Sequence, residues 1–109
     1  MKLPSSIRVG CYDISVQQME DREAMSHGIY GHYASTEHTI RINGELSPIK
    51  MLNTLMHEVF HACYDIAGLS DEDEEERIVT LMANACTQVV RDNPDYNRFV
   101  QQCIKEGAK

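Results

Sequence analysis

The stretch MLNTLMHEVFHACYDIAGLS, residues 51–70, has the pattern of an amphipathic helix and carries two histidines four residues apart. Ser47 suits the N-cap of this helix, Pro48 its first turn, and Gly68 the position just past its end. Apolar residues recur at the helical period, at Leu52, Leu55, Met56, Val59, Cys63 and Ile66. The stretch therefore predicts one long helix against which a sheet and further helices can pack.

His57, Glu58 and His61 form the pattern His-Glu-x-x-His in the middle of this helix. Residues four apart share a helix face, so both histidines can reach one metal ion. That side of the helix is otherwise polar and lies roughly opposite the apolar stripe, so we expect the histidines to face a cleft. Glu58 is turned about 100° from His57, which suits a group that handles the proton of a metal-bound water better than a ligand.

Chance does not readily produce this pattern. With five histidines in 109 residues, and ten glutamates, random placement gives roughly 0.02 occurrences. A catalytic zinc needs a third protein ligand and an open position for water. The remaining histidines, His27, His32 and His38, all precede the motif, and Ala67 stands where a metzincin has its third histidine. A carboxylate from the next helix is therefore expected.

The candidates for the third ligand are Glu72, Glu75 and Glu76, which lie at the start of the next helix. Asp65 is a poorer candidate, because it lies on the same helix as the histidine pair and is turned away from it. On a helical wheel, Glu75 falls in the centre of the apolar stripe of its helix. A carboxylate there is costly unless it meets a metal, which favours Glu75. Glu76 lies at the edge of that stripe, in line with Val79, Ala83 and Thr87, where a water-filled cleft is more accessible. The wheel leaves both open.

The segment before the motif has the pattern of strands. Ile7, Val9 and Cys11 alternate, and Ile14 and Val16 alternate after a change of face, which indicates a strand with a bulge or bend. Residues 17–26 fit a short helix or a loop equally well. Residues 28–34 and 38–43 predict a β-hairpin joined by Ser35, Thr36 and Glu37, with a turn at Asn43-Gly44.

Two more helices follow the motif. Ser70 suits the N-cap of the first, with Asp73 at the capping-box position, and Asn93-Pro94 opens the second, which should end near Gly107. The expected packing stripes are Ile78, Leu81, Met82, Ala85 and Val89 on the first, and Tyr96, Phe99, Val100, Cys103 and Ile104 on the second. The acidic run 71–76 is interpreted mainly as a solvated helix start, since its spacing does not match an EF-hand loop. We predict an α+β domain over residues 1–109, with an antiparallel sheet of about three strands packed on the motif helix and two further helices.

Composition limits the partners. The net charge of −7 disfavours direct binding of nucleic acid, although it does not exclude a basic protein. The sequence shows neither a signal peptide nor a membrane-spanning segment, so a cytoplasmic protein is expected. Cys11, Cys63, Cys86 and Cys103 form no CxxC pair and are predicted to be reduced thiols that pack as small apolar residues.

Several segments together resemble the ImmA/IrrE-like metallopeptidases and their small relatives in phage genomes. The similar segments are GIYGHYASTEHTIRIN at residues 28–43, HEVFH at 57–61, EERIVTLMANA at 75–85 and RDNP at 91–94. The resemblance spans about residues 28 to 98 and implies a zincin-like minimal domain with Glu76 as the third ligand and Glu75 in reserve. It also implies the cytoplasm of a bacterial host, if the chain is phage-encoded. The chain lacks the methionine-proline ending of the ligand helix that larger members carry.

The function these features predict is a zinc-dependent metallo-endopeptidase. His57, His61 and Glu76 would hold Zn²⁺, and Glu58 would act as general base on a zinc-bound water. Tyr33, Tyr64 or a hairpin histidine is a candidate donor to the oxyanion. The expected partner is a peptide or protein substrate, which could bind at a hairpin edge by strand addition, and a protein activator is possible.

Two alternatives stay open: a zinc hydrolase of non-protein substrates, and a zinc-stabilised binding or regulatory module without proteolysis. Glu58 argues against the module, because a structural zinc site has no use for a base beside the metal. Such a site also usually has four ligands, and Cys63 points too far round the helix to be one. A DNA-mimicking acidic surface is less favoured, since the negative charge gathers at one helix start.

Overall fold

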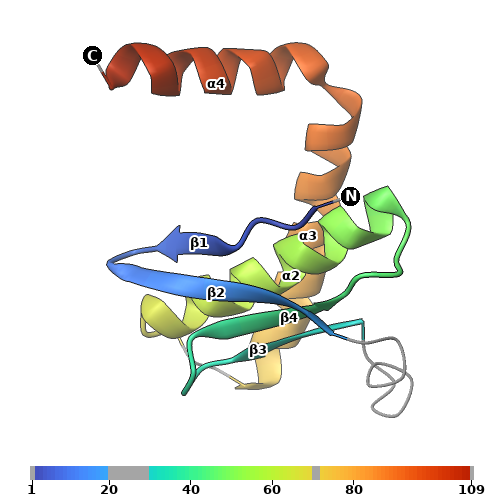
Figure 1. The fold of residues 1–109 in the computed structure, drawn as a ribbon, viewed down its shortest axis with the longest axis vertical. Coiled ribbons are helices and arrows are strands. Elements are labelled where there is room, and N and C mark those ends of the chain that lie inside the picture. Colours follow the sequence, from blue (N-terminus) through green and yellow to red (C-terminus); the bar gives the residue numbers. More distant parts are fainter. Residues whose placement is uncertain (1, 20–29, 70–71, 109) are drawn as a thin grey trace.

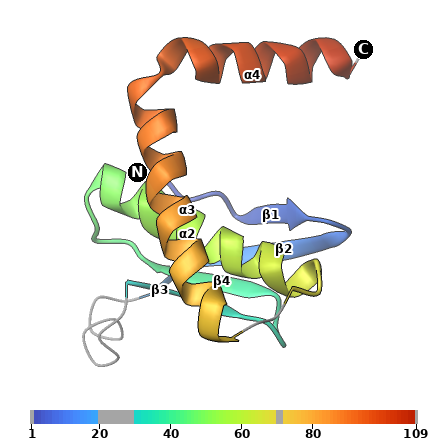
Figure 2. The same cartoon turned by 180° about the vertical axis from the view of Figure 1, so that it is seen from behind.

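The computed structural model describes residues 2–19, 30–69 and 72–108. The strands are β1 (Ser6–Val9), β2 (Tyr12–Met19), β3 (Gly31–Ala34) and β4 (Thr39–Asn43), and the helices are α2 (Pro48–Ile66), α3 (Glu72–Asp92) and α4 (Pro94–Gly107). The sheet lies on one side of α2 and α3 crosses the other side (Figures 1 and 2). The α+β class and the three helices are confirmed.

The sheet differs from the prediction in strand number and direction. Its order is β1-β2-β4-β3, with antiparallel outer pairs and a parallel central pair, β2 and β4. The prediction of one bent strand over residues 7–16 was wrong, because the chain reverses between Val9 and Tyr12. Gly10 has φ +60°, which a two-residue hairpin turn of type II′ needs at its first position. That reversal explains the change of face in the sequence pattern.

The predicted hairpin of residues 28–34 and 38–43 is confirmed where the structure describes it. β3 and β4 pair antiparallel, with Tyr33 opposite Ile40. Residues 28 and 29 lie outside the described residues, as do residues 20–26 of the segment left undecided between helix and loop. The first part of that segment is strand, since β2 extends to Met19.

Helix α2 begins and ends where the sequence predicts. Pro48 stands in its first turn after Ser47, although the Ser47 side chain makes no capping hydrogen bond. At the other end Gly68 has φ +76°, its N–H donates to the Asp65 carbonyl at 3.1 Å, and the Leu69 N–H donates to the Tyr64 carbonyl at 2.9 Å. This pair of bonds is the Schellman ending, for which glycine is the favoured residue.

The core lies between the sheet and α2, around Ile14, Ile40, Ile42 and Met51. The buried residues of α2 are Met51, Thr54, Glu58 and Ala62. The predicted apolar stripe lies on a different side of α2 from these buried residues. Three of its members, Leu55, Val59 and Ile66, are partly buried and pack against the core. The reason is that α2 is covered on two sides, by the sheet and by α3, so its apolar residues do not mark a single packed face.

The packed face of α3 is not the predicted one. Its buried residues are Val79, Ala83 and Thr87. Of the predicted stripe, Ile78 is half-buried and the other four residues, Leu81, Met82, Ala85 and Val89, are exposed. The small side chain of Ala83 permits close approach to α2, and Asn53 of α2 donates to Thr87 Oγ1 at 3.0 Å and to Asn84 Oδ1 at 3.1 Å. The predicted cap at Ser70 and Asp73 lies outside the residues whose side chains are described.

Helix α4 begins at Pro94 as predicted, but none of its residues is buried. It lies across the far end of α3, away from the sheet (Figures 1 and 2). The four cysteines are free, as predicted, yet Cys11 and Cys103 are exposed and do not pack as core residues. No helix in the described ranges combines the length and apolar character needed to cross a membrane.

Candidate metal centre

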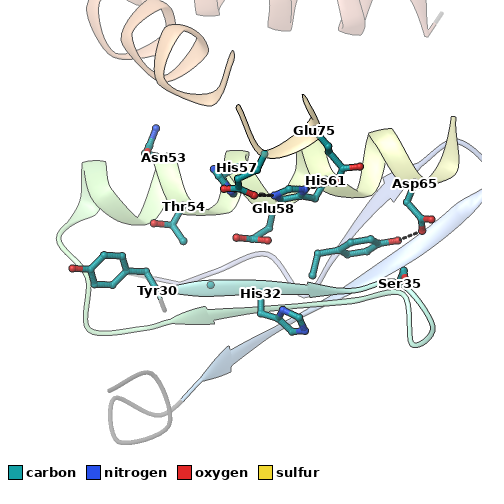
Figure 3. Close-up of a pocket in the computed structure, with 13 residues that line it drawn as sticks. Tyr30, His32, Ser35, Asn53, Thr54, His57, Glu58, His61, Asp65 and Glu75 are labelled. Carbon is teal, nitrogen blue, oxygen red and sulfur yellow. Dashed lines mark hydrogen bonds and ion pairs between the residues drawn. The ribbon is translucent and has the colours of Figure 1, made fainter. Parts of the chain in front are cut away.

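Helix α2 brings His57 and His61 onto one face, and the second turn of α3 brings Glu76 against both. The two Nε2 atoms lie 3.2 Å apart. Glu76 Oε1 lies 3.1 Å from His57 Nε2, and Glu76 Oε2 lies 2.8 Å from His61 Nε2. Figure 3 shows both histidine rings directed toward the start of α3. Among the described residues, these three form the group whose ligand atoms all lie within 4.8 Å of one another.

These distances fit a metal ion. Ligand atoms about 2.0–2.1 Å from a tetrahedral zinc lie about 3.3 Å from one another. The two Nε2 atoms, 3.2 Å apart, are close to that value, and each has one oxygen of the Glu76 carboxylate within 3.1 Å. The pKa of His57 is lowered, chiefly by burial and further by His61, with Glu76 opposing the change. The neutral imidazole that metal binding requires is therefore favoured. Two histidines and a glutamate predicted as ligands thus form a group that can hold a metal.

Glu75 belongs to a second layer of the same centre. Its Oε2 lies 2.6 Å from His61 Nδ1, while Nε2 of that ring faces Glu76. A carboxylate that holds one ring nitrogen fixes the orientation of the other nitrogen toward a metal. On the sequence alone Glu75 and Glu76 compete for one role, whereas the structure directs both carboxylates at the histidines. The side chain of Glu72 is outside the described part of the chain.

Glu58 points from the neighbouring flank of α2 toward β3 (Figure 3). The residue is 7% exposed, and the backbone N–H of Tyr33 donates a hydrogen bond to its carboxylate. Burial is the main cause that raises the pKa of Glu58 to about 7, and the Glu76 carboxylate adds to it, while His61 and the Tyr33 amide act in the opposite direction. A carboxyl group with such a pKa can both accept and release a proton near neutral pH.

The centre opens into a cleft of about 670 Å³ between α2, β3 and the start of α3. That volume is within the range of small-ligand sites. Gly31 lets β3 approach α2 closely, because an added Cβ would lie 2.8 Å from Thr54 Cγ2. The sequence pattern located this glycine on a strand, but the contact depends on how α2 packs.

The candidate oxyanion donors differ in their positions relative to the cleft. Tyr33 lines the cleft, and its hydroxyl donates to Asp65 Oδ2 at 2.7 Å. Burial and that carboxylate hold the pKa of Tyr33 well above its usual range, so the phenol keeps its proton. The His32 ring is turned away from α2 (Figure 3), and His38 lies in the β3–β4 turn against Tyr12, with ring centroids 4.6 Å apart. Tyr64 is not among the described residues that line the cleft, and His27 falls outside the described ranges.

Comparison with known proteins gives no relative: no protein-family model, no curated protein and no solved structure matches the chain. An assignment of function therefore rests on the geometry of the site and on the motif resemblance.

Proposed function

We propose that this chain is a zinc-dependent hydrolase, and that it acts as a metallo-endopeptidase. The observation that carries the proposal is a single arrangement: two histidine Nε2 atoms 3.2 Å apart, a Glu76 carboxylate with one oxygen near each of them, and a buried carboxylate, Glu58, on the neighbouring flank of the same helix. The HEVFH motif and its resemblance to ImmA/IrrE-like metallopeptidases support the same assignment.

The ligand set supports a catalytic site over a structural one. His57, His61 and Glu76 would hold the ion, and the described residues supply no fourth member to the group. Three protein ligands beside an open cleft are typical of catalytic zinc, while structural zinc is usually closed by four. When bound, zinc would supply Lewis acidity, which acidifies water and polarises a carbonyl oxygen.

Side chains of the protein would carry out the proton transfer and hold the reacting groups in position. Glu58 would accept a proton from water and later return it to the leaving amine, for which its pKa of about 7 is suited. The Tyr33 N–H fixes one position of the carboxylate and so limits the orientations it can take. Glu75 would keep His61 oriented.

A peptide is the substrate that the cleft favours. Among the described strands β3 stands last in the sheet order β1-β2-β4-β3, so it is an edge strand of the described sheet. It also forms one wall of the cleft. An extended peptide can add to such an edge by backbone hydrogen bonds, which would place its carbonyl groups along the wall that faces the metal ligands. A non-protein substrate has no matching feature among the described residues.

The test has two stages, metal first and cleavage second. Purified protein is dialysed and its zinc is measured by elemental analysis. We expect about one zinc per chain, strong loss in His57→Ala, His61→Ala and Glu76→Gln, and full retention in His32→Ala, whose ring is turned away from the site. Equal zinc in all five proteins would refute the metal centre.

The second stage is a peptide-library digest with the zinc-loaded protein. Wild type should cleave peptides, and Glu58→Gln should keep its zinc and lose activity by about 10²–10⁴-fold, the usual worth of a general base. Undiminished cleavage by Glu58→Gln would remove Glu58 from the mechanism. Normal zinc content without cleavage of any peptide would favour the zinc-stabilised binding module instead.

A further inference from the structure

The outer surfaces of α3 and α4 carry large apolar side chains that stay exposed in the described part of the chain. Between 39% and 64% of each residue is exposed, although each helix arranges its members at helical spacing. We call this set the α3–α4 apolar face; its members are Leu81, Met82, Val89, Tyr96, Phe99 and Ile104. Cys103, on the same side of α4, is also exposed.

The position of α4 makes this exposure unusual. The helix packs chiefly on the end of α3, stands clear of the sheet (Figures 1 and 2) and contains no buried residue. An isolated helix of fewer than about 12–15 residues is marginal in water, and most helices in proteins are held by packing of their apolar side. With 14 residues, α4 is at that limit. A further surface that packs against its apolar side would account for its sequence pattern.

The distribution of charge indicates which surface this is. Residues 78–109 contain four Lys or Arg and three Asp or Glu, a net charge of +1, whereas residues 1–77 contain six and fourteen, a net charge of −8. Asp92 and Asp95 are paired with Arg91 and Arg98 within the same region. Two copies of this acidic chain repel each other through most of their surface, but not through this region.

The same balance disfavours other occupants. Helices that lie on anionic membranes carry an excess of Lys and Arg on the polar side. On α4, Arg98 and Lys105 are balanced by Asp95 and Glu106. A strongly charged protein partner would find no complementary charge here, and a basic one would be attracted to the acidic remainder of the chain.

Large exposed apolar side chains are what the centre of a dimer interface needs. The six residues are each 39–64% exposed, and they would form the apolar centre of a standard interface, which buries roughly 800 Å² per partner. We propose that the α3–α4 apolar face is a homodimer interface, in which α4 of each copy packs against α3 and α4 of the other about a two-fold axis. The metal centre lies at the start of α3, whereas α4 follows the end of α3 (Figure 1), so contacts made through α4 leave both clefts open.

Sedimentation velocity across the micromolar range tests this proposal on the full chain. Wild type should sediment as a species of twice the 12.4 kDa chain mass. Phe99→Glu should raise the dimer dissociation constant at least about tenfold, since a charge in an apolar interface is left without a partner. Leu69→Glu is the matched control, because Leu69 is equally exposed, at 60% against 64%, but lies between α2 and α3; it should leave dimerisation unchanged.

A second variant guards against a local effect on α4. Leu81→Gln lies on α3, whose opposite side packs on α2, and it should weaken the dimer while circular dichroism shows the helical content unchanged. His57→Ala, which disables the proposed metal centre, should dimerise as wild type does, so the two proposals can fail separately. A monomeric wild type at all concentrations would overturn the proposal, as would equal dimerisation of Phe99→Glu and Leu69→Glu.

Discussion

Replacing Glu58 with glutamine should stabilise the metal-free protein, and the gain should depend on pH. The pKa of this carboxyl moves from 4.5 to about 7 on folding. At about 1.4 kcal/mol per pH unit, this corresponds to about 3 kcal/mol of unfolding free energy. The residue is 7% exposed, so solvent screening removes little of that value.

The direction depends on which state holds the proton more tightly. Below pH 4.5 the carboxyl is neutral in both the folded and the unfolded chain, and it costs the fold nothing. Between pH 4.5 and about 7 the unfolded chain ionises Glu58 more readily than the folded protein does, so wild type loses stability as the pH rises. Glutamine is neutral throughout, so the difference between Glu58→Gln and wild type should grow across this window and level off above it.

The assay is urea unfolding of both proteins in the presence of a chelator, at several pH values from about 4.5 to 8. Any fixed cost of the glutamine amide is the same at every pH and does not alter the trend. At pH 8 the gain corresponds to an increase in melting temperature on the order of 10 °C. A difference that stays flat within about 0.5 kcal/mol, or that shrinks as the pH rises, would refute the assignment of Glu58 as a buried carboxyl of raised pKa.

Zinc provides an internal control for the same measurement. A cation next to Glu58 favours the carboxylate, so saturating zinc should narrow the difference between the two proteins at pH 8. If the difference in unfolding free energy between the two proteins were the same in zinc as in chelator, Glu58 would not interact with the metal. Its proposed role as a base beside the ion would then lose support.

Three further substitutions test the surroundings of the site. Glu75→Ala should weaken zinc binding about 10-fold by releasing His61 Nδ1, a smaller loss than that of Glu76→Ala, as measured by competition with a chromogenic chelator. Gly31→Ala should destabilise the protein by about 1–3 kcal/mol in urea unfolding, because the added Cβ lies 2.8 Å from a side chain of α2. Gly68→Ala should cost about 1 kcal/mol by the same assay, since its φ of +76° is unfavourable for alanine although the space around it is open.

The parts of the fold that local sequence determines could be predicted. Helix α2 was located because Ser47, Pro48 and Gly68 mark its ends, and the spacing of His57 and His61 then places them on one face whatever else the chain does. The β3–β4 hairpin was also located from local sequence, because two short strand patterns are joined there by a short connection. The β1–β2 turn was missed because Gly10-Cys11 is not one of the common hairpin dipeptides, and an alternating pattern that shifts face fits a bulge as well as a turn.

The parts that depend on packing could not be predicted in the same way. The wheel for α3 assumed that its large apolar residues face the protein, but Val79, Ala83 and Thr87 do so instead. When the packed face is assigned wrongly, the directions inferred for the side chains of Glu75 and Glu76 are wrong as well. The resemblance implies Glu76 as the third ligand, whereas the wheel leaves Glu75 and Glu76 open, and the structure brings Glu76 within reach of both histidines.

The acidic run at the start of α3 shows how these two levels combine. As a sequence it is explained by the helix dipole, which stabilises carboxylates in a first turn. Glu75 and Glu76, however, contact His61 on both of its ring nitrogens, and Glu76 also reaches His57. These contacts attach the start of α3 to α2 at the cleft that the buried Glu58 also lines. A metal ion bound there would replace the contacts of Glu76 with stronger ones, so we expect metal binding to fix α3 on α2 and to offset part of the destabilisation that Glu58 causes.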